Sequence, residues 1–203
     1  MKYTISCLAL LLTVVLNAQT PVDKEWHFGA KGDLNLTNIS GNGMKNGYTT
    51  GFQIGGYAEK KFNSHWSVQP ELLFSQNNAK VDVTDFLKYY VNGNTYASNN
   101  IKLGYISVPI IFKYHINPYF SFVAGPQYSQ MLFDAESLMV NPENKGVAFK
   151  RYDVSINGGA EAYIGSVTLY ARYNKGLVNI NNIDDRYSWM SQHIQLGVAV
   201  KIK

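Results

Sequence analysis

Apolar and polar residues alternate along most of this sequence. Between residues 26 and 36, Phe28 and Leu34 fall on one phase, and Lys31 and Asp33 fall on the other. An alternation with a period of two predicts a β-strand with one apolar and one polar face. No comparable stretch with a helical period follows residue 25, so the sequence indicates an all-β fold.

The same alternation recurs often enough to predict eight strands. Each segment has roughly ten residues, which is the length that a tilted strand needs to cross a bilayer. An even number of strands is also typical of single-chain bacterial barrels. The eight predicted segments are Trp26–Leu36, Phe52–Lys61, Trp66–Gln76, Tyr105–Tyr114, Phe120–Gln130, Tyr152–Tyr163, Val167–Asn174 and Ile194–Ile202.

The connections between these segments alternate in length. Short turns alternate with long links rich in Asn, Gly, Asp and Ser, and outer-membrane barrels have short turns at one rim and long loops at the other. The turns are Asn63–His65, Asn117–Pro118 and Ile164–Ser166, and the links are Asn38–Gly47, Asn77–Lys102, Phe133–Lys150 and Gly176–Met190.

Charged residues on the polar phase indicate which face points inward. Inside a narrow barrel these side chains can pair with one another, whereas an Arg or Lys on the lipid face costs about 2–4 kcal/mol at the midplane. We therefore expect the polar face inside and the apolar face outside. The alternative is a soluble lipocalin-like barrel with its apolar face inside. The charged residues are Lys31, Asp33, Glu59, Glu71, Lys113, Asp153, Glu161 and Arg172.

Small and aromatic residues add three expectations. Four glycines on the polar phase (Gly29, Gly55, Gly125 and Gly159) leave room for long neighbours in a crowded lumen. Pro109 and Pro126 lack the N–H that a strand needs, so they predict local bulges. Aromatic residues at strand ends predict an interfacial girdle, with Trp26, Trp66, Tyr114, Tyr119, Tyr152 and Tyr163 as its members.

The first residues have the layout of a secretory signal peptide. Lys2 precedes an apolar run from Ile5 to Leu16, and Ala18 supplies a small residue at the expected cut. We expect a signal peptide at 1–18 and a barrel domain at 19–203, with an N-terminal anchor helix as the alternative. Cys7 lies inside the run, where a lipoprotein cysteine would not stand. The mature chain would then contain no disulfide framework, thiolate nucleophile or cysteine metal site.

The composition limits the classes of partner. Aromatic residues make up 14% of the chain, charged residues make up 16%, and the formal net charge is +4. Lys and Arg are dispersed and form no run, so we expect no nucleic-acid partner.

Three stretches resemble the PorT-like outer membrane β-barrel domain family: Leu103–Tyr114, Ala124–Tyr128 and Arg172–Leu177. The resemblance extends from about Trp26 to the end of the chain. It implies an outer-membrane barrel and permits an accessory role in secretion or envelope assembly. Many such barrels end on an aromatic residue, whereas this sequence ends Lys201-Ile202-Lys203, which is a departure from the pattern.

The histidines are the first candidates for chemistry. His65 and His115 lie at tight turns and are interpreted as rim residues. His27 and His193 share the polar phase of the first and last strands, so a closed barrel could bring them together beside Asp33 as a proton or metal site. Lumen filling is the preferred interpretation, because no metal-ligand spacing such as His-Glu-x-x-His is present.

A second candidate is an outer-membrane lipid-modifying enzyme. Ser191 and His193 share a strand phase, Ser188 is close in sequence, and Asp184 and Asp185 lie upstream. Such an enzyme needs a histidine with serine and acidic partners at the outer rim. The chain has no G-x-S-x-G motif and no phosphate-binding glycine loop.

The sequence thus predicts an eight-stranded antiparallel up-and-down transmembrane β-barrel in the outer membrane. We expect a structural, adhesion or secretion-accessory role through the long external loops, without a general pore. We expect no enzymatic activity, no cofactor, and no catalytic or metal-binding residues. The expected partners are outer-membrane lipid and envelope or secretion proteins that contact the loops, and the expected state is a monomer.

Overall fold

A computed structural model describes residues 26–80, 82, 100–135, 149–183 and 186–202. The predicted signal peptide, Asp184 and Asp185, and large parts of the links at 77–102 and 133–150 lie outside this range. Every one of the eight predicted strands falls within it. No helix in the described part of the chain is long and apolar enough to cross a membrane.

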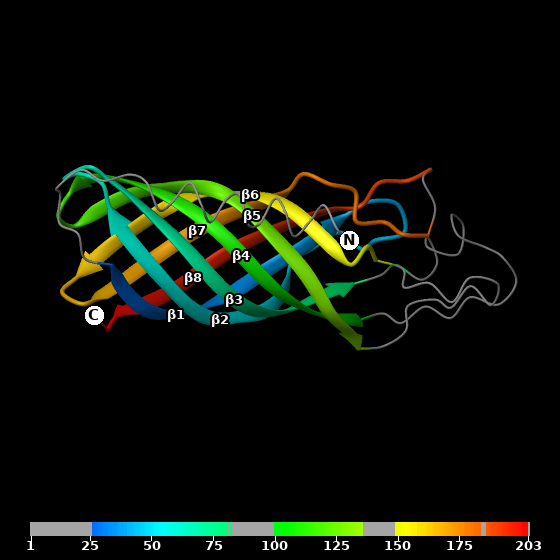
Figure 1. The fold of residues 1–203 in the computed structure, drawn as a ribbon. Helices are drawn as coiled ribbons and strands as arrows, with labels where there is room; N and C mark the ends of the chain where they lie inside the picture. Colours follow the sequence, from blue (N-terminus) through cyan, green and yellow to red (C-terminus); the bar gives the residue numbers. More distant parts are fainter. Residues whose placement is uncertain (1–25, 81, 83–99, 136–148, 184–185, 203) are drawn as a thin grey trace, which may run out of the picture.

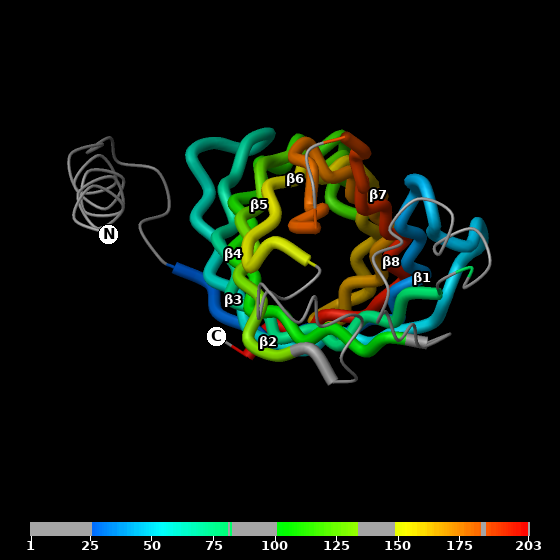
Figure 2. The backbone as a smooth tube through the Cα atoms, turned by 90° about the vertical axis from the view of Figure 1, so that its right-hand side faces the viewer, coloured from blue at the N-terminus to red at the C-terminus, as the bar shows by residue number. Residues whose placement is uncertain are grey.

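The eight strands form one closed barrel in which each strand pairs with its sequence neighbours and β1 pairs with β8 (Figure 1, Figure 2). All pairings are antiparallel. The predicted all-β, up-and-down architecture is therefore confirmed. The strands are β1 (His27–Ser40), β2 (Thr49–Lys61), β3 (Trp66–Lys80), β4 (Asn100–Asn117), β5 (Phe120–Ala135), β6 (Tyr152–Ile164), β7 (Val167–Gly176) and β8 (Met190–Lys201).

Short turns gather at one end of the barrel, together with the start of β1 and the end of β8 (Figure 1). Two of the turns are held by an asparagine. Asn63 Oδ1 accepts hydrogen bonds from the backbone N–H groups of His65 and Trp66, both at 2.8 Å. Asn117 Oδ1 accepts the same kind of bond from Tyr119 and Phe120. The third turn uses Gly165, whose φ of 61° favours glycine.

The apolar face of the barrel points outward. Leu34 is 66% exposed and Phe122 is 61% exposed, whereas Lys31 and Glu71 are 4% and 3% exposed. This is the opposite of a soluble binding barrel, so the lipocalin-like alternative is wrong. A belt of this kind is stable only in a nonpolar medium such as lipid. This agrees with the orientation that we predicted from the charged residues in mid-strand.

Three of the predicted girdle residues lie exposed at the short-turn rim. Trp66 and Tyr114 lie on paired strands with their ring centroids 5.0 Å apart, and both side chains are exposed. Tyr119 is exposed at the same rim, whereas the exposed Tyr152 begins β6 and lies at the long-link end. Tyr163 was predicted to join them, but it follows the lumen-facing phase of β6, and its hydroxyl donates to Glu161 Oε2 at 3.0 Å.

The glycine prediction is confirmed for Gly29 and Gly159, whereas the proline prediction is wrong. A Cβ at Gly29 would meet the Tyr57 ring at 2.4 Å, and one at Gly159 would lie 3.0 Å from Arg172 Cγ. These glycines therefore make room for long neighbours. The β4–β5 register shifts at Gly104/Tyr105 and His115/Asn117, and it is continuous across Pro109. The pairing of β5 with β6 is likewise continuous across Pro126.

Several strands extend further toward the long-link end than the alternation predicted. β4 has 18 residues, and Leu103 pairs with Asn77 in a stretch that was assigned to a link. β1 and β8 stay paired as far as Ser40 and Met190. Backbone pairing therefore continues beyond the point where the outward side chains stop being apolar, because the ladder needs no particular side chain.

Candidate functional site

Polar side chains fill the barrel lumen in layers, and each layer is built from the inward phase of several strands. A charged layer lies toward the short-turn end, a neutral polar layer lies above it, and an apolar layer closes the long-link end. These layers are the candidate site, because they decide whether anything can enter or cross the barrel.

The charged layer begins at Glu71 on β3. Lys31 Nζ on β1 lies 3.0 Å from Glu71 Oε2, and Arg172 Nη1 on β7 lies 2.9 Å from Glu71 Oε1. Arg172 also donates from Nη2 to Glu161 Oε1 on β6 at 2.7 Å. One guanidinium thus joins two carboxylates, and all of these side chains are buried.

The layer continues through Lys113 on β4. Its Nζ lies 2.6 Å from Glu161 Oε2 and 3.3 Å from Glu59 Oε2 on β2. Glu59 Oε1 accepts a bond from Ser67 Oγ at 2.8 Å and lies 3.6 Å from His115 Nε2. We call Lys31, Glu59, Glu71, Lys113, Glu161 and Arg172 the ion network. It links six strands and balances three cations against three carboxylates.

Two of the eight predicted lumen charges lie outside the ion network. Asp33 accepts a 2.5 Å hydrogen bond from the Tyr170 hydroxyl, and Asp153 accepts a 2.6 Å bond from Ser191 Oγ. Neither is within ion-pair distance of a cation in the described residues. The prediction of mutual pairing is therefore confirmed for six of the eight, and hydroxyl groups replace cations at the other two.

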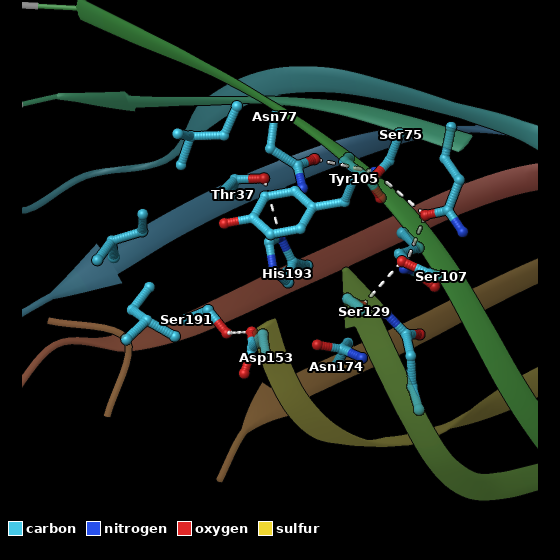
Figure 3. Close-up of a pocket in the computed structure, with 17 residues that line it drawn as sticks. Thr37, Ser75, Asn77, Tyr105, Ser107, Ser129, Asp153, Asn174, Ser191 and His193 are labelled. Carbon is cyan, nitrogen blue, oxygen red and sulfur yellow. Dashed lines mark hydrogen bonds between the residues drawn. The ribbon is translucent and has the colours of Figure 1, made fainter. Parts of the chain in front are cut away.

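A small cavity lies above the ion network, and we call it the outer chamber (Figure 3). Its volume is about 30 Å³. The wall contains neutral amides and hydroxyls, one acid, Asp153, and one histidine, His193, together with the apolar Ile39, Leu103 and Ile180. Short bonds join wall residues, including Ser107 Oγ to Ser129 Oγ at 2.8 Å and Asn174 Nδ2 to Ser155 Oγ at 2.8 Å.

An apolar cluster closes the chamber toward the long-link end, and we call it the apolar cap. It consists of Ile39, Met44, Ala79, Ile101, Leu103, Tyr105, Met131, Phe149, Ile180 and Trp189. Its centre is Trp189, which is fully buried, and whose ring lies 5.1 Å from that of Phe149. In Figure 2 the chain before β8 and the start of β6 reach across the ring.

Backbone bonds hold the cap in place. Ile180 N–H donates to Trp189 O at 3.0 Å, and Lys150 N–H donates to Ile180 O at 2.8 Å. Trp189 Nε1 donates to Asn42 O at 3.1 Å, which ties the cap to the link after β1. Part of the link at 176–190, which was predicted to be an external loop, therefore turns inward, and its residues Ile180 and Trp189 cover the lumen.

The opposite end of the lumen opens into a wide cavity of about 740 Å³, which we call the vestibule. The short turns form its rim, and His65 and His115 lie there as predicted. His115 is bonded on both ring nitrogens, to Ser67 and Ser121, at 2.9 and 2.7 Å. The ion network forms the floor that separates the vestibule from the outer chamber.

The structure does not bring His27 and His193 together, so the proton or metal site that was the less favoured interpretation is wrong. His27 lies at the vestibule, whereas His193 lines the outer chamber opposite Thr37, ten positions further along β1. That separation is about 30 Å along the strand. The reason is topological, because β1 and β8 run in opposite directions. Asp33 contacts neither histidine in the hydrogen bonds of the described residues and instead accepts from Tyr170.

Ser191 and His193 share the lumen phase as predicted, but each has another partner. Ser191 donates to Asp153, and His193 Nδ1 pairs with Thr37 Oγ1 at 2.9 Å. Both lie beneath the apolar cap, while Ser188 is exposed outside it. The lipid-modifying alternative requires a serine–histidine couple at an accessible rim, and this arrangement does not provide one. Within the described ranges, no three His, Cys, Asp or Glu side chains group to hold a metal.

Comparison with known proteins gives a consistent result. A family model for the outer membrane protein β-barrel domain matches residues 17–182. Neisserial surface protein A has a similar solved structure, with a TM-score of 0.53 and 16% identity, covering 86% of this chain and 97% of that one. Ail, the attachment invasion locus protein of Yersinia pestis, has a TM-score of 0.47 and 14% identity, covering 86% and 99%.

No match was found among curated protein sequences. The narrower resemblance to PorT-like barrels stays a prediction, since the matching family model is the broader one. The model covers most of the chain, and its description agrees with an outward apolar belt and a closed eight-stranded barrel. The chain therefore belongs to the outer membrane protein β-barrel domain family and is located in the outer membrane.

Proposed function

We propose that this protein is a non-conducting barrel that acts in adhesion or surface contact through its outer end. The observation that supports the proposal most is the double closure of the lumen. The ion network crosses the barrel from β1 to β7, and the apolar cap covers the outer chamber. A small solute would have to displace both layers to pass.

The outer end supplies the surface for such contacts. Short turns mark the periplasmic rim of an outer-membrane barrel, so the long links face outward. Lys45, Lys80 and Lys102 are exposed at this end, and Lys45 N–H bonds Lys80 O at 3.1 Å. We expect partners to contact the links 77–102 and 133–150, which follow the long strands β3 and β5.

We also propose that the protein is a monomer, is exported through a signal peptide and has no enzymatic activity. Apolar side chains are exposed on every strand, which fits a monomer surrounded by lipid. Export would use the signal peptide at 1–18, and we expect no enzymatic activity. PorT-like membership would be the narrower classification.

A secretion-accessory role is the second candidate, and the vestibule is the observation that favours it. This cavity opens at the periplasmic rim and has the cationic Lys61 and Lys201 in its wall. A periplasmic protein segment could enter it as far as the ion network. The vestibule and the outer links lie at opposite ends, so one experiment can separate the two roles.

The experiment compares three strains that express the full-length barrel, a variant with residues 85–97 replaced by a short Gly-Ser linker, and a K61E/K201E vestibule variant. Retention on coated surfaces and secretion of envelope proteins are measured in each strain. The adhesion proposal expects the linker variant alone to lose retention. Loss of secretion in the vestibule variant, with retention unchanged in both variants, would contradict it. A heat-dependent electrophoretic shift checks that each barrel is folded.

A further inference from the structure

The outer chamber contains a buried carboxylate that no cation of the described residues neutralises. Asp153 is 7% exposed, and Ser191 Oγ donates a hydrogen bond to its Oδ2 at 2.6 Å. Its second oxygen, Oδ1, is buried without a partner. Burying an uncompensated carboxylate is costly, so such groups are normally paired or hold a cation.

Two other oxygen atoms of residues in the chamber wall are also buried without a hydrogen-bond partner. Oδ1 of Asn35 and Oδ1 of Asn174 are buried without a hydrogen-bond partner, and both residues are 1% exposed. The amide groups of both residues donate elsewhere, which fixes their orientation. Asn174 Nδ2 donates to Ser155 and Asn157, and Asn35 Nδ2 donates to Gln53 and Asn77. Both residues line the outer chamber, and the Oδ1 atom of each has no hydrogen-bond donor.

The arrangement of these groups is visible in Figure 3, where Asp153, Ser191 and Asn174 lie on one side of the chamber. β7 joins β6 to β8 in the barrel, and Asn174 lies directly opposite His193 in the β7–β8 register. Asp153, Asn174 and Asn35, each with one buried oxygen that has no hydrogen-bond partner, are thus among the residues that line a chamber of about 30 Å³. One water needs about 10–15 Å³, so an ion and a water can fit.

We propose that the outer chamber binds a small monovalent cation, of the size of Na⁺ or K⁺, through Asp153 with Asn174 and Asn35. Carboxylate and amide oxygens suit hard cations. A single acid balances one positive charge, whereas protein sites for divalent cations usually gather several carboxylates. The apolar cap and the ion network enclose the ion on both sides, so bulky organic cations are excluded.

The inference goes beyond the proposed surface role, because the site lies inside the lumen. Its consequence is mechanical. The cation would bridge β6, β7 and β1 above the ion network and so stabilise the outer half of the barrel, where no ion pair of the described residues does this. Asp153 lies at the outer end of β6, two residues after the exposed Arg151, so the site also anchors the strand that leads into the cap.

The test measures thermal unfolding of the full-length folded barrel in detergent micelles. Sodium, potassium and choline chloride are compared at equal ionic strength, so that screening of the ion network is the same. We expect the Tm to be higher in sodium or potassium than in choline by about 2–4 °C. Asp153→Asn should abolish the difference, whereas Ser129→Ala, a neutral change in the same wall, should keep it.

A second measurement uses the wild-type protein, so it does not depend on whether the Asp153→Asn variant folds. Crystals of the wild-type barrel soaked in rubidium or thallium salts should show an anomalous peak beside Asp153 Oδ1. Absence of the peak, or a Tm difference that persists in folded Asp153→Asn, would overturn the proposal. So would an infrared carbonyl band of a protonated acid that disappears in Asp153→Asn, because a proton would then neutralise the carboxylate.

Discussion

The two halves of the lumen are closed by different physical means. The periplasmic half is closed by the ion network, in which each cation touches at least one carboxylate and Arg172 and Lys113 touch two. The outer half is closed by neutral hydrogen bonds under an apolar cap that is centred on Trp189 and Phe149. Both halves use buried side chains, and they differ in charge and in the part of the sequence that supplies them.

The difference shows how a membrane barrel can fill its interior. The ion network draws on strand residues alone, so it is fixed once the barrel closes. The cap combines strand residues with link residues such as Ile180 and Trp189, and the link residues must fold back over the mouth. We therefore expect the inner half to determine global stability and the outer half to respond locally.

The largest expected effect comes from Arg172→Ala. This change leaves Glu71 and Glu161 with one cation each in a buried site, and removing one partner of a buried pair costs about 3–5 kcal/mol. Urea unfolding followed by tryptophan fluorescence measures the loss. Arg172→Lys keeps the charge and serves as the matched control, although it cannot reach both carboxylates as the guanidinium does. A loss under 1 kcal/mol in Arg172→Ala would show that the network contributes little.

Trp189→Ala should have the next largest effect. Replacing a buried Trp by Ala costs about 3–5 kcal/mol, and the lower end applies where neighbouring residues can collapse into the space. Hydrogen exchange should accelerate in the cap segments 149–151 and 178–189 while the ion-network strands stay protected. Equal acceleration in both halves would contradict the separation of the two closures. Tyr187→Ala, beside the cap but only partly buried, provides a milder comparison.

A smaller effect is expected for Ser191→Ala in the outer chamber. The change removes the hydrogen bond to Asp153, and bonds to charged groups contribute about 1.5–3 kcal/mol. Since the chamber can admit water in place of the hydroxyl, we expect a loss of about 1.5 kcal/mol in urea unfolding. Ser188→Ala, which lies outside the cap, should be neutral. If both serines behave alike, the outer chamber has no special role in stability.

The smallest expected effect is the coupling free energy between substitutions in the ion network and in the apolar cap. No residue of the ion network belongs to the cap, and distant independent sites add within about 0.3–0.5 kcal/mol. The double variant Arg172→Ala/Trp189→Ala should therefore lose the sum of the two single losses. A coupling above 1 kcal/mol in this double-mutant cycle would mean that the two closures form one unit.

Much of the barrel wall is predictable from sequence, because a period of two identifies both the strands and their faces. Phe28 against Lys31 and Leu72 against Glu71 are sufficient to assign the outward face once lipid is the medium. The partners of each charge are not predictable in this way. Lys31 meets Glu71 and Arg172 meets Glu71 across the barrel, and only the register of several strands decides those contacts.

The link part of the apolar cap, which includes Phe149, Ile180 and Trp189, was missed because these residues lie in links that were expected to be polar. Ile180 lies among asparagines, and no strand alternation marks any of the three. A usable signal was the presence of large apolar residues in links that were expected to be solvated. The less favoured His27–His193 site is excluded for a simpler reason, since neighbouring strands in an up-and-down barrel place their first residues at opposite ends.

The conductance of the purified barrel in a planar bilayer tests the central claim most directly, namely that two separate layers close the lumen. We expect wild-type barrels to insert without a steady conductance, as judged by immunodetection of protein in the bilayer. Arg172→Ala and Trp189→Ala should each stay closed or flicker, and the double variant should conduct more than either. A stable, voltage-independent open conductance in the wild type would contradict the account, because ions would then cross two layers of side chains that fill the lumen in the structure.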